Sequence, residues 1–388
     1  YQRIVASSEA RVETASPAAL ITMVDEAASI AGAYLWDFSV SGGHAWKAEH
    51  ALARFCRKHL PERVAKGHQE LLLGLPAELP PPYPAAPAHA VQSLDWVRPT
   101  LGESQATTST TMSAASGLLA RRARLAEERR AVEASCRNAL AGRPELARRF
   151  NALLTLAQRY AVLREEQAWW FTLGWPLMRR AVLRLGEELR QRGMIERGED
   201  VFFLTRAELE KHLGAGQTGG HEVIGSLRSL VNARRGEWER QRRLSPPLVV
   251  GNPLGERVIA RATDAMRTPT QTDERPGGAA AHAVLKGMPA SPGRATGPVR
   301  IVRGPEDFER FEPGEVLVAQ VTAPAWTPLF ARAAAVVTDG GSLAAHASLV
   351  AREYGIAAVV GTGDATVRLR DGQRVTVDGS AGIVTLAE

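Results

Sequence analysis

The sequence of 388 residues has little cysteine and few aromatic residues. Its two cysteines, Cys56 and Cys136, exclude a disulfide framework and a metal site built from four cysteines. Both lie in helix-like stretches, so we expect unreactive core thiols. No apolar run approaches the length of a membrane span and no signal-peptide pattern opens the chain, which predicts a cytoplasmic protein without a membrane partner. Since the chain begins at Tyr1 and not at methionine, we also expect a processed product or a piece of a longer protein.

The sequence also lacks a large excess of charge of one sign. The net charge is +6 at pH 7, and arginines alternate with glutamates in "RRARLAEERRAVEASCRNALAGRPELARR" (residues 121–149). Mixed charge at helical spacing is typical of a solvated helix face. No segment combines basic and aromatic residues as nucleic-acid-binding motifs do. We therefore do not expect nucleic acid as a partner.

The pattern of apolar residues changes once along the chain. Up to residue 267 apolar residues recur every three or four positions, as in "FNALLTLAQRYAVLREE" (150–166), which predicts a large helical domain over 1–267. Residues 268–283 are rich in proline, glycine and small residues without an apolar period, which predicts a flexible linker. Residues 284–388 then contain six β-like runs and two short helical stretches, which predict a compact α/β domain. The runs are 297–302, 315–320, 334–339, 355–361, 374–379 and 382–387, and the helices lie near 327–333 and 346–354.

One segment of this domain, "VVTDGGSLAAHASLVAREYGIAAVVG" (336–361), joins a glycine-rich turn to a helix. Gly340 and Gly341 permit backbone angles that bring amide groups close to a ligand. The helix that starts near His346 leaves its first N–H groups unpaired and carries partial positive charge at that end. These features predict a phosphate site in which the His346 imidazole attacks a phosphoryl group and holds it as a phosphoramidate. The alternative is a histidine with a structural role only.

Three further residues belong to this candidate site. Thr338 precedes the turn, Ser342 follows it, and Arg352 lies two turns along the helix from His346. We expect all three to bind phosphate together with the two glycines. We expect no metal ligand in this chain.

Residues 284–388 resemble the swivelling phosphohistidine domain of the phosphoenolpyruvate-utilising enzymes, which include phosphoenolpyruvate synthase, pyruvate phosphate dikinase and rifampicin phosphotransferase. The resemblance rests on "KGMPASPGRATGPVRIV", "GEVLVAQVTAPAWTPLF", the segment around His346 and the closing "DGSAGIVTL". It implies a compact β/β/α domain whose histidine, His346 in this sequence, accepts phosphate from ATP or phosphoenolpyruvate.

The segment departs from the family pattern in two places. The family has two glycines, two further residues and then Ser, Thr or Cys before the histidine. This pattern puts Gly341 and Ser342 on the glycine pair, and Ala344 and Ala345 on positions that usually carry a hydroxyl or thiol. Ala357 replaces the usual proline. Because the missing polar groups could help to hold the imidazole or the phosphate, a non-phosphorylated histidine stays open as an interpretation.

The helical part resembles, more loosely, the acceptor-binding region of rifampicin phosphotransferases. The resemblance implies that residues 1–267 bind a small, largely apolar acceptor. The paired glycines of "SGGHAW" (41–46) predict a turn from which His44 faces a cavity, whereas His50, His59 and His68 are expected at the surface. Clustered aromatic residues at helical spacing are also typical of a core, so that reading stays open. The candidate acceptor-binding residues are Trp36, His44, Trp46, Arg164, Trp169 and Trp170.

No nucleotide-binding module, Walker-type loop or phosphoenolpyruvate barrel is recognisable in the sequence. The resemblance therefore implies the acceptor-binding and phosphohistidine-carrier part of an ATP-dependent dikinase-like phosphotransferase that swings on residues 268–283. No cofactor is expected to bind firmly, because ATP and Mg²⁺ would bind an ATP-grasp domain or subunit that is a partner or a missing segment. The alternative is a binding or assembly module, or a catalyst of a phosphate-independent reaction in the helical pocket.

Overall fold

The structure, a computed structural model, describes residues 2–75, 89, 91, 98–103, 110–213, 221–241, 244 and 283–387. The chain divides into two compact units. Unit 1 comprises Tyr1–Asp37, Ala88–Ser104 and Trp170–Pro247, and unit 2 comprises Phe38–Pro87, Gln105–Trp169 and Leu248–Glu388. The middle of the helical region thus forms one unit with the C-terminal sheet domain. Of the predicted linker 268–283, the structure describes Ala283 alone, so the predicted domain division stays a prediction.

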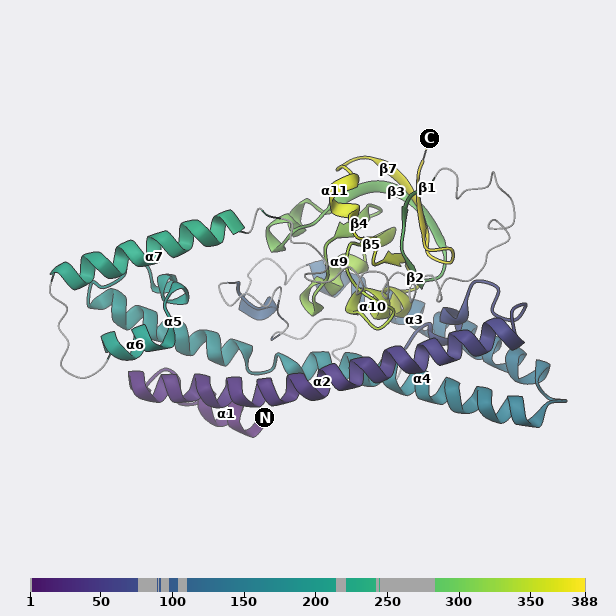
Figure 1. Cartoon of the computed structure of the whole chain (residues 1–388), viewed down its shortest axis with the longest axis horizontal. Helices are drawn as coiled ribbons and strands as arrows, with labels where there is room; N and C mark the ends of the chain where they lie inside the picture. Colours follow the sequence, from purple (N-terminus) through teal and green to yellow (C-terminus); the bar gives the residue numbers. More distant parts are fainter. Residues whose placement is uncertain are drawn as a thin grey trace, which may run out of the picture. The chain divides into compact units, whose positions relative to one another are not determined.

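The helical region precedes the sheet domain (Figure 1). In the described residues it consists of α1 (Gln2–Glu9), α2 (Pro17–His59), η1 (His68–Leu72), η2 (Leu101–Glu103), α3 (Thr110–Ala139), α4 (Pro144–Phe171), α5 (Trp175–Gln191), η4 (Gly198–Phe203), α6 (Arg206–Leu213) and α7 (His221–Gln241). Helix α5 illustrates how these helices form. It buries Leu177, Ala181 and Leu185, spaced by one turn, in the core of unit 1.

Helix α2 corrects two expectations. It runs without interruption through Gly42 and Gly43, so the turn predicted for 41–46 does not exist. A glycine inside a helix costs only about 1 kcal/mol, which the rest of a 43-residue helix readily tolerates. Among the described residues α2 is also the one helix long and apolar enough to cross a membrane, so the expectation that no run approaches this length is wrong. Core helices of soluble proteins and signal sequences pass the same test, so length and composition alone do not assign α2 to a membrane.

The helical part of unit 2 has its own core, in which both cysteines lie. Cys56 of α2 and Cys136 of α3 pack with Leu52, Phe150 and Leu154, among others. Burial raises the pKa of the Cys56 thiol to about 12 and that of Cys136 to about 11. Because the thiolate is the reactive species, both residues are unreactive core thiols, as expected.

The sheet domain contains a mixed sheet (Figure 1). Its strand order is β1-β8-β7-β3-β4-β5-β6-β2. Strands β3 to β6 are parallel to one another, and β7, β8, β1 and β2 pair antiparallel. The six predicted strands are present, and the structure adds β1 and β2, which were not predicted. The bounds are β1 (Ala283–Lys286), β2 (Met288–Ser291), β3 (Arg294–Ile301), β4 (Val316–Ala319), β5 (Ala335–Thr338), β6 (Ala357–Val360), β7 (Arg374–Asp378) and β8 (Ile383–Leu386).

Both faces of β4, β5 and β6 are buried, which explains why these strands are rich in Val and Ala. One face packs against α9 and α10 through residues such as Phe330 and Val350. The other face packs against α11 and β7 through residues such as Ala365 and Val375. The short helices of the domain are η6 (Pro305–Arg310), η7 (Pro324–Trp326), α9 (Thr327–Phe330), α10 (His346–Tyr354) and α11 (Ala365–Arg368).

Candidate functional site

The carboxyl ends of β4, β5 and β6 meet at one edge of the sheet because the three strands are parallel. The segment after β5, Asp339–Ala345, is called the histidine loop here because it leads into His346. Its backbone is bound to the loops on either side. The Gly340 amide donates to the Gln320 carbonyl at 2.8 Å, and the Gly361 amide donates to the Gly340 carbonyl at 3.3 Å. The loop is therefore supported from both neighbouring strands.

Glycine is required at only one position of the predicted pair. Gly341 has a φ of 112°, which side-chain-bearing residues rarely adopt, whereas Gly340 is not among the residues with positive φ. A Cβ at Gly341 would lie 3.4 Å from the Ala345 Cβ. The Thr338 hydroxyl donates to the Gly340 carbonyl at 2.7 Å and so fixes the start of the turn. Phosphate binding by Thr338 and by the glycines stays a prediction.

His346 is the first residue of α10, as predicted, where the first N–H groups of a helix lack intrahelical partners. Ser342 shapes the approach to it, because its carbonyl accepts from the Ala345 amide at 2.9 Å and from the Ser348 hydroxyl at 2.7 Å. The imidazole is half-buried, with its ring edge-on to Phe330 at 5.9 Å between centroids. Both ring nitrogens are shielded from solvent in this arrangement. Phosphoryl transfer therefore requires that the ring be uncovered.

Asp339, the first residue of the histidine loop, was not among the predicted site residues. Its buried carboxylate accepts from the Thr366 amide at 2.9 Å and from the Thr366 hydroxyl. These bonds fasten the loop to α11. In the described residues no group of three or more His, Cys, Asp or Glu side chains could hold a metal ion.

Arg352 is placed differently from the other predicted phosphate-binding residues. It is 1% exposed, and its guanidinium donates to the Leu343 carbonyl at 2.6 Å and to the Ser348 carbonyl at 3.1 Å. Its third partner is the Glu49 carboxylate of α2, at 2.6 Å. The guanidinium is thus engaged on both sides of His346. Its binding to phosphate stays a prediction.

Glu49 sits between two cationic or potentially cationic groups. Its Oε1 atom also lies 3.1 Å from Nε2 of His68, in η1. Burial by itself would raise the pKa of Glu49, but the charge of Arg352 and the contact with His68 outweigh burial and lower that pKa. Glu49 is therefore ionised at neutral pH. His68 is 4% exposed, so the expectation that it lies at the surface is wrong, because it packs against this carboxylate.

A second ion pair also joins the helical part of unit 2 to α10, but here the helical part supplies the cation and α10 supplies the anion. Arg122 of α3 lies 3.2 Å from Glu353, the residue next to Arg352. Arg121 also donates to the Gly355 carbonyl at 3.1 Å, and the Gly74 amide donates to the Arg352 carbonyl at 3.1 Å. The helical part thus supplies one anion and one cation to consecutive residues of α10.

The predicted acceptor-binding residues are distributed over both units. In unit 2, the His44 ring stacks on Tyr160 at 5.6 Å and Arg164 lies 3.5 Å above the Phe38 ring. Trp46 stacks on His50 and packs against the core that α9 and α10 share. In unit 1, Trp36 is 73% exposed and Trp170 is half-buried. The Trp169 side chain lies outside the described residues. A common pocket for these residues stays a prediction.

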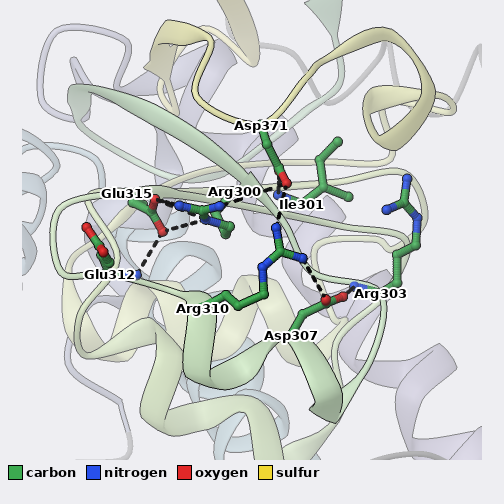
Figure 2. Close-up of polar contacts among 8 residues, drawn as sticks. All are labelled: Arg300, Ile301, Arg303, Asp307, Arg310, Glu312, Glu315 and Asp371. Atoms are coloured by element: carbon green, nitrogen blue, oxygen red, sulfur yellow. Dashed lines mark hydrogen bonds and ion pairs between the residues drawn. The ribbon is translucent and has the colours of Figure 1, made fainter.

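The other concentration of charge in the sheet domain lies away from the histidine loop. Figure 2 shows Arg300 bound to Glu315, and Arg310 bound to both Asp307 and Asp371. The Nη2 atom of Arg300 lies 2.6 Å from Oε1 of Glu315. Glu315 immediately precedes β4, whereas the histidine loop follows β5. Because β4 and β5 are parallel, the two sites lie at opposite edges of the sheet. The hydrogen bond to Glu315 raises the pKa of Arg300, as expected of a structural ion pair.

Residues 311–382 match the family model of the PEP-utilising enzyme, mobile domain. This segment is a PEP-utilising enzyme mobile domain. The match confirms the predicted resemblance, and a mostly helical region followed by a mixed sheet confirms the predicted fold class. The sheet domain, residues 283–387, is called the mobile domain below.

Three relatives show how far the similarity extends. The chain is 36% identical over 247 residues to chondramide synthase cmdD of Chondromyces crocatus, which covers 61% of this chain and 6% of that protein. It is 40% identical over 205 residues to the uncharacterized phosphotransferase YvkC of Bacillus subtilis, which covers 53% of this chain and 23% of that protein. It is 32% identical over 211 residues to rifampicin phosphotransferase of Bacillus subtilis, which covers 54% of this chain and 21% of that protein. The chain thus spans less than a quarter of each relative's length.

Proposed function

We propose that this chain is the acceptor-binding and phosphohistidine-carrier part of a dikinase-like phosphotransferase. The observation that carries the proposal is the position of His346 inside the mobile domain, where it follows the histidine loop and is the first residue of α10. Relatives named as phosphotransferases support the reaction class. A role in the cytoplasm, and an acceptor that is small and largely apolar, belong to the same proposal.

The reaction has two steps. A ring nitrogen of His346 forms a bond to a phosphorus atom while the bond from that phosphorus to the donor oxygen breaks. An oxygen of the acceptor then attacks the same phosphorus, the P–N bond breaks, and the imidazole is released. Backbone N–H groups of the loop and of the first turn of α10 would stabilise the transferring oxygens through preorganised electrostatics.

The donor side of the reaction is proposed to lie on another domain or subunit. An ATP-grasp module would bind ATP and Mg²⁺, supply the phosphoryl group, and dock with the mobile domain. In this chain the acceptor would bind near His44, Trp46 and Arg164, with Trp36, Trp169 and Trp170 as further candidates. Catalysis there would consist mainly of positioning and charge stabilisation.

Chemical phosphorylation tests the carrier histidine without any partner. The chain is incubated with potassium phosphoramidate, whose P–N bond breaks as ammonia leaves and the His346 nitrogen binds phosphorus. The expected product is one acid-labile, base-stable phosphoryl group on His346, detected by mass spectrometry and ³¹P NMR. His346→Ala should lose it, and the control His59→Ala should keep it. Wild-type chain that takes up no phosphoryl group under these conditions would contradict the proposal.

A second candidate function is a binding or assembly module that no longer transfers phosphate. Two observations favour it: Ala344 and Ala345 bring no hydroxyl or thiol to the histidine, and both ring nitrogens of His346 are shielded. This candidate predicts no uptake from phosphoramidate together with retained binding of a small apolar ligand. The two functions therefore separate in the same experiment.

A further inference from the structure

Arg352 connects the two sides of the candidate carrier histidine. It binds the Leu343 carbonyl, which lies three residues before His346, and the Ser348 carbonyl, which lies two residues after it. One rigid guanidinium therefore sets the distance between the end of the histidine loop and the first turn of α10. A planar fork of donors is suited to this task because its geometry is fixed.

The guanidinium depends on a carboxylate from a distant part of the chain. Arg352 is buried, and a buried cation requires a partner that offsets the loss of hydration. Glu49 of α2, 303 residues away in the sequence, provides that charge at 2.6 Å, and His68 contacts the same Glu49 oxygen. Both Glu49 and His68 are buried. The orientation of Arg352 is thus determined by the helical part of unit 2.

We propose that Glu49 is a positioning residue for His346, acting through Arg352. This inference rests on the proposed function. While the mobile domain is packed on the helical part of unit 2, Glu49 holds Arg352 in place, and Arg352 holds the carbonyls on both sides of His346. When the mobile domain leaves that position, the ion pair breaks and this hold on the loop is lost. The backbone on both sides of the carrier histidine is therefore held in one arrangement of the mobile domain, the one in which that domain is packed on the helical part of unit 2.

The second ion pair makes this arrangement specific. Because Arg122 pairs with Glu353 next to Arg352, sliding α10 by one residue in one direction would set Arg122 against Arg352, and sliding it in the other direction would set Glu49 against Glu353. Like charges in a buried contact are strongly unfavourable. Leu125 adds a steric limit, since a Cβ at Gly355 would lie 2.8 Å from its Cδ2 atom. The contact thus accepts one register of α10.

The test compares variants of the full chain for the rate of phosphoryl uptake by His346 from potassium phosphoramidate. Glu49→Gln should slow uptake roughly tenfold or more, the loss expected when a charge-assisted hydrogen bond is removed. Glu49→Asp keeps the charge and should recover a large part of the rate. The matched control is Glu133→Gln, which removes a carboxylate of similar burial that pairs with Arg129 within α3.

Hydrogen–deuterium exchange supplies a readout that does not depend on phosphorylation. Amides of residues 343–349 should exchange faster in Glu49→Gln and in Arg352→Lys, which keeps a charge but loses the planar fork. They should be unchanged in Glu133→Gln. Wild-type exchange and a wild-type uptake rate in Glu49→Gln would overturn the inference. If wild-type chain takes up no phosphoryl group, the proposed function fails, and exchange alone still decides whether Glu49 positions the loop. If Glu49→Gln does not fold, Glu49→Asp and Arg352→Lys decide it.

Discussion

Helices α5 and α7 of unit 1 differ in their ion pairs from the contact between α10 and the helical part of unit 2. In unit 1, pairs such as Arg190–Glu187 and Arg240–Glu237 join residues one helical turn apart, and their side chains are about half exposed. In unit 2, Glu49–Arg352 and Arg122–Glu353 join distant segments and are almost fully buried. The residue types are the same, but the physical consequences differ. Exposed pairs are screened by water and contribute little, whereas a buried pair becomes costly as soon as one partner is removed.

The largest expected effect comes from breaking a buried pair. Arg352→Met should lower the free energy of unfolding of unit 2 by about 3–5 kcal/mol, because Glu49 is left as an uncompensated buried charge. Urea denaturation followed by circular dichroism measures this loss. The control is Arg370→Met at an exposed position of the same domain, which should change stability little. Equal stability of the two variants would remove the distinction between the two kinds of pair.

The next effect concerns the glycine that ends α10. Gly355 has a φ of 62° and faces Leu125 so closely that a Cβ would lie 2.8 Å from it. Gly355→Ala should cost about 2 kcal/mol or more, since it combines an unfavourable backbone conformation with overpacking. The measurement is the thermal midpoint of unfolding. Gly372→Ala has the same kind of backbone angle but open space around it, so it isolates the conformational part of the cost.

A smaller and pH-dependent effect is expected in unit 1. Hydrogen bonds from Arg234 are the main cause that lowers the pKa of Glu208 from 4.5 to about 2. Since the folded pKa is the lower one, this stabilisation is present above pH 4.5 and is lost as the pH falls toward 2. Glu208→Gln should therefore cost less than about 1 kcal/mol at pH 7, because the pair is only partly buried. Unfolding curves at pH 7 and pH 3 should show the difference from wild type shrinking at the lower pH.

The smallest effect is expected at a solvent-exposed pair. Glu187→Gln removes the partner of Arg190 within the same helical turn of α5. Because water replaces the lost contact, the thermal midpoint should not change measurably. A clear loss of stability would show that burial does not decide how much an ion pair contributes to the stability of this protein.

Local signals predicted much of the fold. The helix predicted near 346–354 occurs in the structure as His346–Tyr354, and Gly355 in the left-handed conformation ends it. Strands β4 and β5 were predicted as short β-like runs, and the structure buries them on both faces. These features depend on neighbouring residues, so the sequence contains the information directly.

Long-range features could not be predicted in the same way. Glu49 and His68 lie among many charged residues, and nothing in their local sequence indicates a partner in the mobile domain. The glycine pair at 42–43 illustrates the reverse error, because a local turn signal is overridden by a helix that packs into one core before the pair and into another core after it. For the candidate site, His346 and its loop were thus predictable, whereas the support through Arg352 was not.

The opposite charges on consecutive residues 352 and 353 of α10 have a consequence for exchanging parts between related proteins. A transplanted mobile domain would pack on the recipient's helices with both ion pairs formed only if those helices placed an acid opposite residue 352 and a base opposite residue 353. Grafts should therefore carry the complementary helical residues Glu49 and Arg122 with them.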